Sequence, residues 1–506
     1  MKTKRLTEAI DRAVLDPLMA LVRWVQDALP KQLFEIIVAL IVGYVVARLM
    51  LRNVMFGVGL ITAMICMLLL LRRPYWVVYG ALAFIPLHWM RLLGDRVRIV
   101  SFLSLVAFLY YLFSSMIERR KINERIFWLY LGFMFMALIS IADSGQWHIG
   151  YHYLRMYIFA LMFAFAAIMC IDDVSKLRTA VKILVAWGIA ESLLGVLQSL
   201  VSVKFFPSYY FGVFGMGVVK AYAVQGIFRA SGTFESGPRY AMFVMLPMAL
   251  ALCYFYSQAM QRRGMWLLVL SLHALAILVS FTRAAYGMVF LLFLIYFLTE
   301  RRRELAYKAI FYTLSIGLLF SFVLVLLIPE QINDAVEARM RFETGGTYKD
   351  RIYFGYNGFM AFLENPLLGI GPGMYNGRSW EFMQRFVVPW ESVRWEVGAL
   401  EMPQNVAVHN AYIRIMAENG ILGIVFYALI FLVSFRDLFK VIRSEADPWM
   451  IATARGVMIY LTIMLPYWFF HEYIVDEAYV AILPIVLATI LRRVNDRLIA
   501  ARSPDG

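Results

Sequence analysis

Long apolar runs recur along almost the whole chain, and they constrain its fold more than any other feature. About fourteen of them approach the ~20 residues that a helix needs to cross a bilayer. Hydrophobic residues make up 62% of the 506 positions and charged residues only 16%, which is too apolar for a soluble protein. The sequence therefore predicts an all-α, polytopic integral membrane protein with about 12–14 transmembrane helices. The expected spans are 33–50, 54–71, 75–90, 99–117, 126–142, 153–171, 180–201, 240–256, 265–282, 284–298, 309–328, 414–435, 451–470 and 478–491.

The net charge of +14 gathers in short basic clusters between apolar runs, for example Arg301-Arg302-Arg303 and Arg492-Arg493. Such clusters mark the cytoplasmic side of a membrane protein, so we expect both termini there and no nucleic acid as partner. The segments expected on the opposite side are 143–152, 202–239, 329–410 and 471–477. The turn at 91–98 is an exception, because it carries Arg91, Arg96 and Arg98.

We divide the chain into four regions. They are an amphipathic segment on the cytoplasmic face at 1–30, N-terminal transmembrane helices at 31–201, a middle region at 202–435 that includes the outer loop 329–410, and C-terminal helices with a tail at 436–506. All three cysteines lie in apolar runs, which argues against a disulfide framework or a thiol metal site.

The loop 329–410 is unusually long for so hydrophobic a chain, and such loops are usually functional. Asp350 can cap a helix that runs from Arg351 to about Leu363, and Asn365-Pro366 ends that helix. The glycines of 369–373 then predict a tight turn. It is not a nucleotide loop, because no Lys-Ser/Thr follows it.

His409 is the first candidate for chemistry, since it lies at the end of this loop and just before an apolar span. A neutral imidazole there could accept a proton from a hydroxyl, or it could be an interfacial histidine bonded to a carbonyl group. Weaker candidates on outer loops are His148, His152 and His471.

Four arginines are expected near the same outer face, namely Arg155, Arg229, Arg283 and Arg351. Together they could bind phosphate oxygens, whereas each alone could simply be a snorkelling or ion-paired arginine. Glu191 lies in the middle of a span. A carboxylate there is either functional or protonated and bonded to a neighbouring helix.

Four stretches, in this order, resemble the O-antigen ligase and O-antigen polymerase superfamily. They are Arg229–Phe234, Ser280–Arg283, Asp350-Arg351 leading to Asn365–Gly373, and His409–Tyr412 followed by Glu418–Gly423. The resemblance covers roughly residues 225–435 and makes 202–435 the expected catalytic region. The chain departs from the family in two ways, because fourteen spans exceed the usual twelve and residues 374–405 match nothing we can place.

The resemblance implies a bacterial inner-membrane enzyme whose active face is periplasmic. It would transfer a glycan from undecaprenyl pyrophosphate to an acceptor hydroxyl with inversion, using no cofactor and no metal. His409 and Arg283 would be catalytic, and Arg229, Arg351, Arg155, Tyr412 and Glu191 would bind substrate. Expected partners are the lipid-linked glycan donor, a glycan or lipid A–core acceptor, membrane lipids and, for a polymerase, a chain-length regulator.

Several functions stay open on the sequence alone. The chain could join a finished glycan to lipid A–core, or it could polymerise repeat units of an O-antigen or exopolysaccharide. A lipid-linked oligosaccharide flippase is the alternative from another class, and it should place ionisable groups along a central cavity at mid-membrane. Only Glu191 fits that pattern, whereas the arginines lie at the outer edge. A scaffold protein would not need the clustered arginines.

Overall fold

The structure is a computed structural model that describes fourteen stretches of the chain and three isolated positions. These are 75–87, 91–92, 97–117, 124–145, 147–200, 223–224, 227–228, 230–234, 236–257, 263–299, 346–385, 407–444, 447–472 and 478–502, with Tyr307, Phe311 and Ser315. The expected segments at 1–30, 33–50, 54–71 and most of 309–328 lie outside the described residues.

The contacts between residues divide the chain into two compact units. One comprises Met1–Val77 and Leu109–Ile122, and the other comprises Val78–Phe108 and Asn123–Gly506. The helix groups, the candidate site and the pocket described below lie in the second, larger unit.

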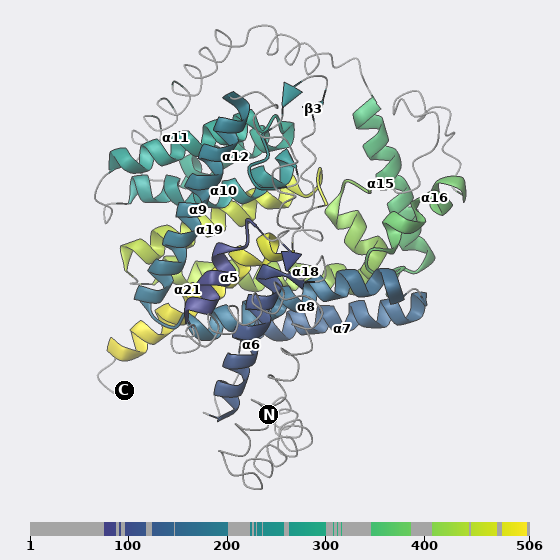
Figure 1. Cartoon of the computed structure of the whole chain (residues 1–506), viewed down its shortest axis with the longest axis horizontal. Coiled ribbons are helices and arrows are strands. Elements are labelled where there is room, and N and C mark those ends of the chain that lie inside the picture. Colours follow the sequence, from purple (N-terminus) through teal and green to yellow (C-terminus); the bar gives the residue numbers. More distant parts are fainter. Residues whose placement is uncertain are drawn as a thin grey trace, which may run out of the picture. The chain divides into compact units, whose positions relative to one another are not determined.

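The described secondary structure is almost entirely helical (Figure 1). The helices are α5 (Tyr75–Ala83), α6 (Ile99–Ile117), α7 (Arg125–Ser144), α8 (Trp147–Cys170), α9 (Val174–Leu200), α10 (Gly237–Tyr256), α11 (Arg263–Val279), α12 (Arg283–Thr299), α15 (Gly346–Glu364), α16 (Met374–Arg385), α18 (Ala411–Arg443), α19 (Pro448–Tyr467) and α21 (Ala478–Arg502). Two short antiparallel pairs accompany them, β1 (Arg91–Leu92) with β2 (Val97–Arg98) and β3 (Ala223–Val224) with β4 (Ile227–Phe228).

Within the described residues, seven helices are long and apolar enough to cross a membrane. They are α7, α8, α9, α10, α18, α19 and α21, and three shorter apolar stretches lie in α6, α11 and α12. The prediction of an all-α polytopic membrane protein is confirmed. The predicted boundaries hold for α6. The spans 75–90, 265–282 and 451–470 run past the ends of α5, α11 and α19, whereas polar residues at helix ends extend helices such as α18 beyond their apolar centres. Helix α16 was not anticipated from the sequence.

Helix α10 forms the buried centre of one helix group. All its residues are buried except Pro238, Arg239 and Phe255. It packs against α9, α11, α12 and α19. Polar side chains join the helices within this core: the Tyr460 hydroxyl donates to the Met242 carbonyl oxygen over 3.1 Å, and the Tyr254 and Thr453 hydroxyl oxygens lie 2.8 Å apart.

Helix α18 is the centre of a second group and packs against α7, α15, α19 and α21 (Figure 1). It runs antiparallel to α7, since Ser140 lies beside Glu418 while the rings of Phe133 and Tyr427 lie 4.8 Å apart. The start of α18 therefore lies at the same end of the bundle as the end of α7.

Helix α18 is broken at Gly420, whose φ of 65° and ψ of −168° are not helical. The predicted turn after α15 fills this break. The Ile370 N–H donates to the Ala417 carbonyl oxygen over 2.8 Å, and the Ile421 N–H donates to the Pro366 carbonyl oxygen over 2.8 Å. From α7, the Ser140 hydroxyl lies 3.1 Å from the Glu418 carbonyl oxygen. Two separate stretches of sequence therefore form one hydrogen-bonded unit, which satisfies backbone groups that the break would leave unpaired.

We predict that Gly420→Ala destabilises the protein. A β-carbon would overlap the Leu367 carbonyl oxygen, and the backbone angles belong to a region that side chains avoid at a cost of roughly 1–3 kcal/mol. The melting temperature of the purified protein should fall, together with its folded yield. Gly264→Ala is the matched control, because a β-carbon there meets nothing within 4 Å. Equal melting temperatures for both variants would contradict this role of the break.

Candidate functional site

The first turn of α18 fixes the position of His409. The Asn410 side-chain oxygen caps the helix by accepting hydrogen bonds from the N–H groups of Tyr412 (3.0 Å) and Ile413 (3.1 Å). The Ala411 N–H donates to the Trp468 carbonyl oxygen over 2.9 Å, which joins this turn to the end of α19. His409 itself has a φ of 57°, in the left-handed region that residues other than glycine seldom adopt. Strained backbone of this kind is concentrated at functional sites.

His409 belongs to a cluster with Arg351 and His471. Burial, together with the smaller effect of the positive charge of Arg351 on α15, lowers the pKa of His409 to about 4. Burial likewise lowers the pKa of His471, which follows α19, to about 3, with contributions from Arg351 and His409. Both imidazoles are therefore neutral at neutral pH and share one guanidinium as their charged neighbour.

A second charged cluster lies one turn further along α18. Arg414 is fully buried, and its Nε atom donates to the Glu418 Oε1 atom over 3.3 Å. Its Nη1 atom lies 3.6 Å from the Glu472 Oε2 atom, and its guanidinium lies 5.4 Å from the centre of the Tyr153 ring on α8. Buried charges need such partners, since removing one of them leaves the other uncompensated. This cluster fixes α8, α18 and the segment after α19 against one another, next to His471.

Sequence reasoning missed most of this second cluster. It treated Arg414 as the first residue of an apolar span, noted Glu418 only within a motif, and gave His471 as a weak candidate on an outer loop. One signal was available, because an arginine and a glutamate four residues apart at the start of an apolar span predict a paired charge inside the membrane. Nothing in the sequence pointed to Glu472 as their partner.

The other predicted arginines belong to a different turn. Arg283 begins α12 and is exposed, directly after a tight turn in which Phe281 has a φ of 47°. The Ala230 N–H donates to the Val279 carbonyl oxygen over 3.1 Å, so the loop that contains the predicted Arg229 runs beside this turn. Arg229 itself lies outside the described residues.

Glu191 holds this same loop in place. On α9, its carboxyl oxygens lie 2.9 Å from the Thr233 backbone nitrogen and 2.6 Å from the Thr233 hydroxyl, which is also 3.0 Å from the Pro86 carbonyl oxygen. One hydroxyl proton cannot be donated to both acceptors. A protonated Glu191 completes the set, because it donates to Thr233 while Thr233 donates to Pro86.

Gln198 reinforces the loop two turns further along α9. Its side-chain oxygen lies 2.9 Å from the Gly232 backbone nitrogen, and its side-chain nitrogen donates to the Gly232 carbonyl oxygen over 2.9 Å. Gly232 has a φ of 55°, and a β-carbon there would overlap Glu191. The loop therefore requires glycine at this position.

The two parts of the site are connected through α10 and α19. The Tyr467 hydroxyl, at the end of α19, donates to the Pro238 carbonyl oxygen over 2.8 Å at the start of α10. Its ring centre lies 4.6 Å from that of His471. The structure thus places His409, Arg351 and His471 within electrostatic range of one another. The Tyr467 contact connects them to the start of α10, where Gly237 lies close to the Ser280 carbonyl oxygen of the Arg283 turn.

The remaining predicted residues, Tyr412 and Arg155, lie on α18 and α8, the helices that carry the Arg414 cluster. The Tyr412 hydroxyl donates to the Leu465 carbonyl oxygen over 2.7 Å, and its ring centre lies 4.7 Å from that of Phe469. Arg155 is half-buried on α8, two residues from Tyr153. Within the described residues, His, Cys, Asp and Glu side chains form no group of three that could hold a metal ion.

Comparison with protein families gives a match to the model described as O-Antigen ligase over residues 266–428. The match runs from α11 into α18 and includes Arg283, Arg351, His409 and Tyr412. It confirms the resemblance read from the sequence. A comparison with curated proteins found no match.

We predict that Glu191→Gln preserves the loop and that Glu191→Ala does not. The amide of glutamine can accept from the Thr233 N–H and donate to the Thr233 hydroxyl, as a protonated carboxyl does. Alanine leaves the partly buried Thr233 N–H without its acceptor, and an unsatisfied donor of this kind costs about 1–3 kcal/mol when buried. The melting temperature should stay near that of the wild type for glutamine and fall for alanine. A fall of equal size for both variants would show that the loop needs the ionised carboxylate.

Proposed function

We propose that the chain transfers a glycan from a polyprenyl-pyrophosphate carrier to a sugar hydroxyl, because residues 266–428 match the family model described as O-Antigen ligase. The family supports a role in surface polysaccharide assembly by glycosyl transfer, with a lipid-linked glycan donor and a glycan acceptor. The observation that carries the finer proposal is the placement of Arg351 beside two neutral histidines at the start of α18.

The arginines would balance the charge of the leaving group. Breaking the bond between sugar and carrier leaves negative charge on a pyrophosphate, and a guanidinium binds two phosphate oxygens at once. Arg351 supplies one such group beside His409, and Arg283 supplies another at an exposed helix start. We assign Arg229 and Arg155 to the same donor site, with Tyr412 on its wall. Glu191 has an indirect role, because its carboxyl group binds the loop that contains Thr233.

His409 would take the proton of the acceptor. Its neutral imidazole can accept a hydrogen bond from a hydroxyl, although a base with a pKa of about 4 is weak. A pyrophosphate bound to Arg351 counters the charge that lowers this pKa, so donor binding makes His409 a stronger base. His471 stands beside it as a second neutral imidazole that the same donor would affect.

The reaction is then a single displacement. The acceptor oxygen attacks the anomeric carbon while its proton passes to His409. The bond between that carbon and the pyrophosphate oxygen breaks, and undecaprenyl pyrophosphate leaves with both bonding electrons. Direct displacement inverts the anomeric configuration. The acceptor proton leaves His409 for water before the next turnover.

The proposed site lies on the periplasmic face of the bacterial inner membrane, as the basic clusters of the sequence predict. A flippase is the weaker proposal. Glu191 was the only residue that favoured a mid-membrane pathway, and its carboxyl group is bonded to Thr233.

The central test separates donor binding from transfer. We expect His409→Ala to slow transfer about 10²–10⁴-fold with undecaprenyl pyrophosphate affinity largely intact, since general-base steps contribute that much. Arg351→Ala, Arg283→Ala and Arg283→Lys should weaken that affinity as well as transfer, because lysine keeps the charge but loses the two-pronged geometry.

The matched control is Arg443→Ala, at the opposite end of α18, which should change neither quantity. All variants are compared as monodisperse protein. Near-wild-type turnover by His409→Ala would remove the histidine from the mechanism. Unchanged carrier affinity in Arg351→Ala and Arg283→Ala would remove these arginines from the pyrophosphate site.

A deletion strain distinguishes the two activities of this family. A polymerase mutant should retain surface glycans that end after one repeat unit, because attachment continues without chain growth. A ligase mutant should accumulate lipid-linked polymer, because chain growth continues without attachment. Gel separation of the surface glycan and extraction of the lipid-linked fraction measure both. Normal glycan in both fractions would contradict either activity.

A further inference from the structure

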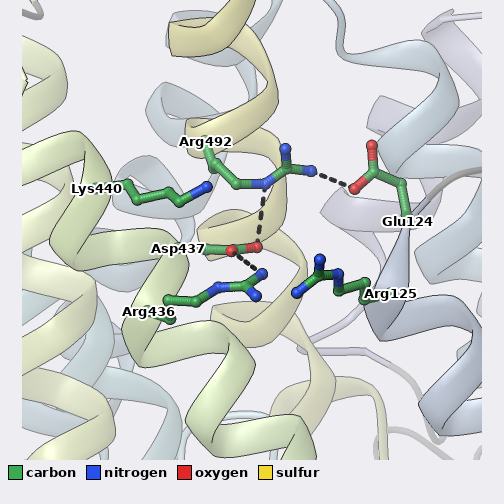
Figure 2. A pocket seen from close by; sticks show the side chains of 6 residues that line it. All are labelled: Glu124, Arg125, Arg436, Asp437, Lys440 and Arg492. Carbon is green, nitrogen blue, oxygen red and sulfur yellow. Dashed lines mark hydrogen bonds and ion pairs between the residues drawn. The ribbon is translucent and has the colours of Figure 1, made fainter.

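A charged pocket lies at the other end of α18 from His409 (Figure 2). It has a volume of about 130 Å³ and is formed by α7, α18 and α21. Its lining residues are Glu124, Arg125, Arg436, Asp437, Lys440 and Arg492. By the rise of 1.5 Å per residue, the 25 residues from Ala411 to Arg436 place it roughly 37 Å along α18 from the proposed catalytic cluster.

Ion pairs use both acidic side chains of this pocket. The Arg492 Nε atom donates to Asp437 over 3.2 Å, and the Arg492 Nη2 atom donates to Glu124. The Arg436 Nη2 atom donates to Asp437 over 2.9 Å. Asp437 is almost fully buried and accepts hydrogen bonds from both Arg436 and Arg492. Arg492 also donates to Asp496, which lies outside the lining.

The positive charges outnumber the negative ones. The lining contains four cationic and two anionic side chains, a surplus of two positive charges. Arg125 and Lys440 form no ion pair with any other residue in the described part of the chain. Figure 2 shows the Arg125 guanidinium pointing toward Arg436 and the Lys440 ammonium pointing toward Arg492. Like charges that face each other across a small cavity create a site for an anion.

The start of α7 adds to this positive potential. Glu124 occupies the capping position of α7, but its side chain makes no capping hydrogen bond. Its carboxylate is used by Arg492 instead. The first N–H groups of a helix and the positive end of its dipole favour an anion at such a place.

The geometry points to a binding site for a phosphate group in this pocket. Arg125 from α7 and Lys440 from α18 would bind the phosphate directly, and Arg436, one turn before Lys440 on α18, would contribute a further positive charge. The pocket lies at the ends of two membrane-spanning helices, α7 and α18, where phospholipid headgroups are found. The phosphate can therefore belong to an anionic lipid, and a soluble phosphate compound is the other source of the same chemistry. A bound phosphate would join α7, α18 and α21.

The test uses the full-length protein in a neutral detergent at low salt. Its melting temperature is followed as short-chain phosphatidylglycerol, inorganic phosphate or the uncharged short-chain diacylglycerol is added. A ligand that binds only the folded protein raises the melting temperature as its concentration passes the dissociation constant. The variants are Arg125→Gln/Lys440→Gln and the control Arg443→Gln, which changes an exposed arginine one turn beyond Lys440.

We expect phosphatidylglycerol to stabilise the wild type and the Arg443→Gln control equally, with at least a tenfold loss of affinity in the double variant. Stabilisation by inorganic phosphate at similar concentrations, lost in the same variant, identifies a soluble phosphate as the ligand. Should the double variant fold poorly, Lys440→Gln alone replaces it, because Lys440 is exposed and unpaired among the described residues. Equal stabilisation by diacylglycerol, no stabilisation by either phosphate, or equal affinity in wild type and variant would each overturn the site.

Discussion

The break in α18 at Gly420 is the constraint on which the site depends. A helix that opens inside a membrane protein exposes backbone groups that lipid cannot satisfy. Here the turn between Pro366 and Gly371 supplies the missing partners, and Ser140 closes the arrangement from α7. This exchange of hydrogen bonds fastens α15 to the first half of α18. It therefore sets where Arg351, on α15, lies with respect to His409, at the start of α18.

Buried charge gives the same region its second constraint. Arg414 is fully buried and needs both Glu418 and Glu472, so α18 and the segment after α19 must come together. That segment carries His471, which brings a second neutral imidazole to Arg351. A rigid wall of paired charges beside two neutral histidines suits a reaction in which an anion departs and a proton is taken up.

Helix α18 thus connects two proposed anion-binding sites, one at each of its ends. At its start, the proposed donor site holds a pyrophosphate that must leave after each turnover. At its end, the surplus cations of Arg125 and Lys440 suit a phosphate that stays and joins three helices. In both proposals cationic side chains bind phosphate, for catalytic turnover at the first site and for holding three helices together at the second. The difference lies in the neighbours, since histidines accompany the first site and carboxylates neutralise part of the second.

The sequence by itself determined the membrane class, the positions of most described helices and the resemblance to the O-antigen ligase family, and it predicted roles for His409 and Arg351. These features are local, because hydropathy, capping residues and short motifs report on neighbouring positions. Only the tertiary structure decided that Arg414 pairs with Glu472, that His471 lies within electrostatic range of His409, that Glu191 holds the Thr233 loop, and that Arg125, Arg436 and Lys440 line one pocket. Each of these contacts joins residues far apart in the chain. Their meeting depends on how whole helices pack, and no pattern along a single helix encodes that.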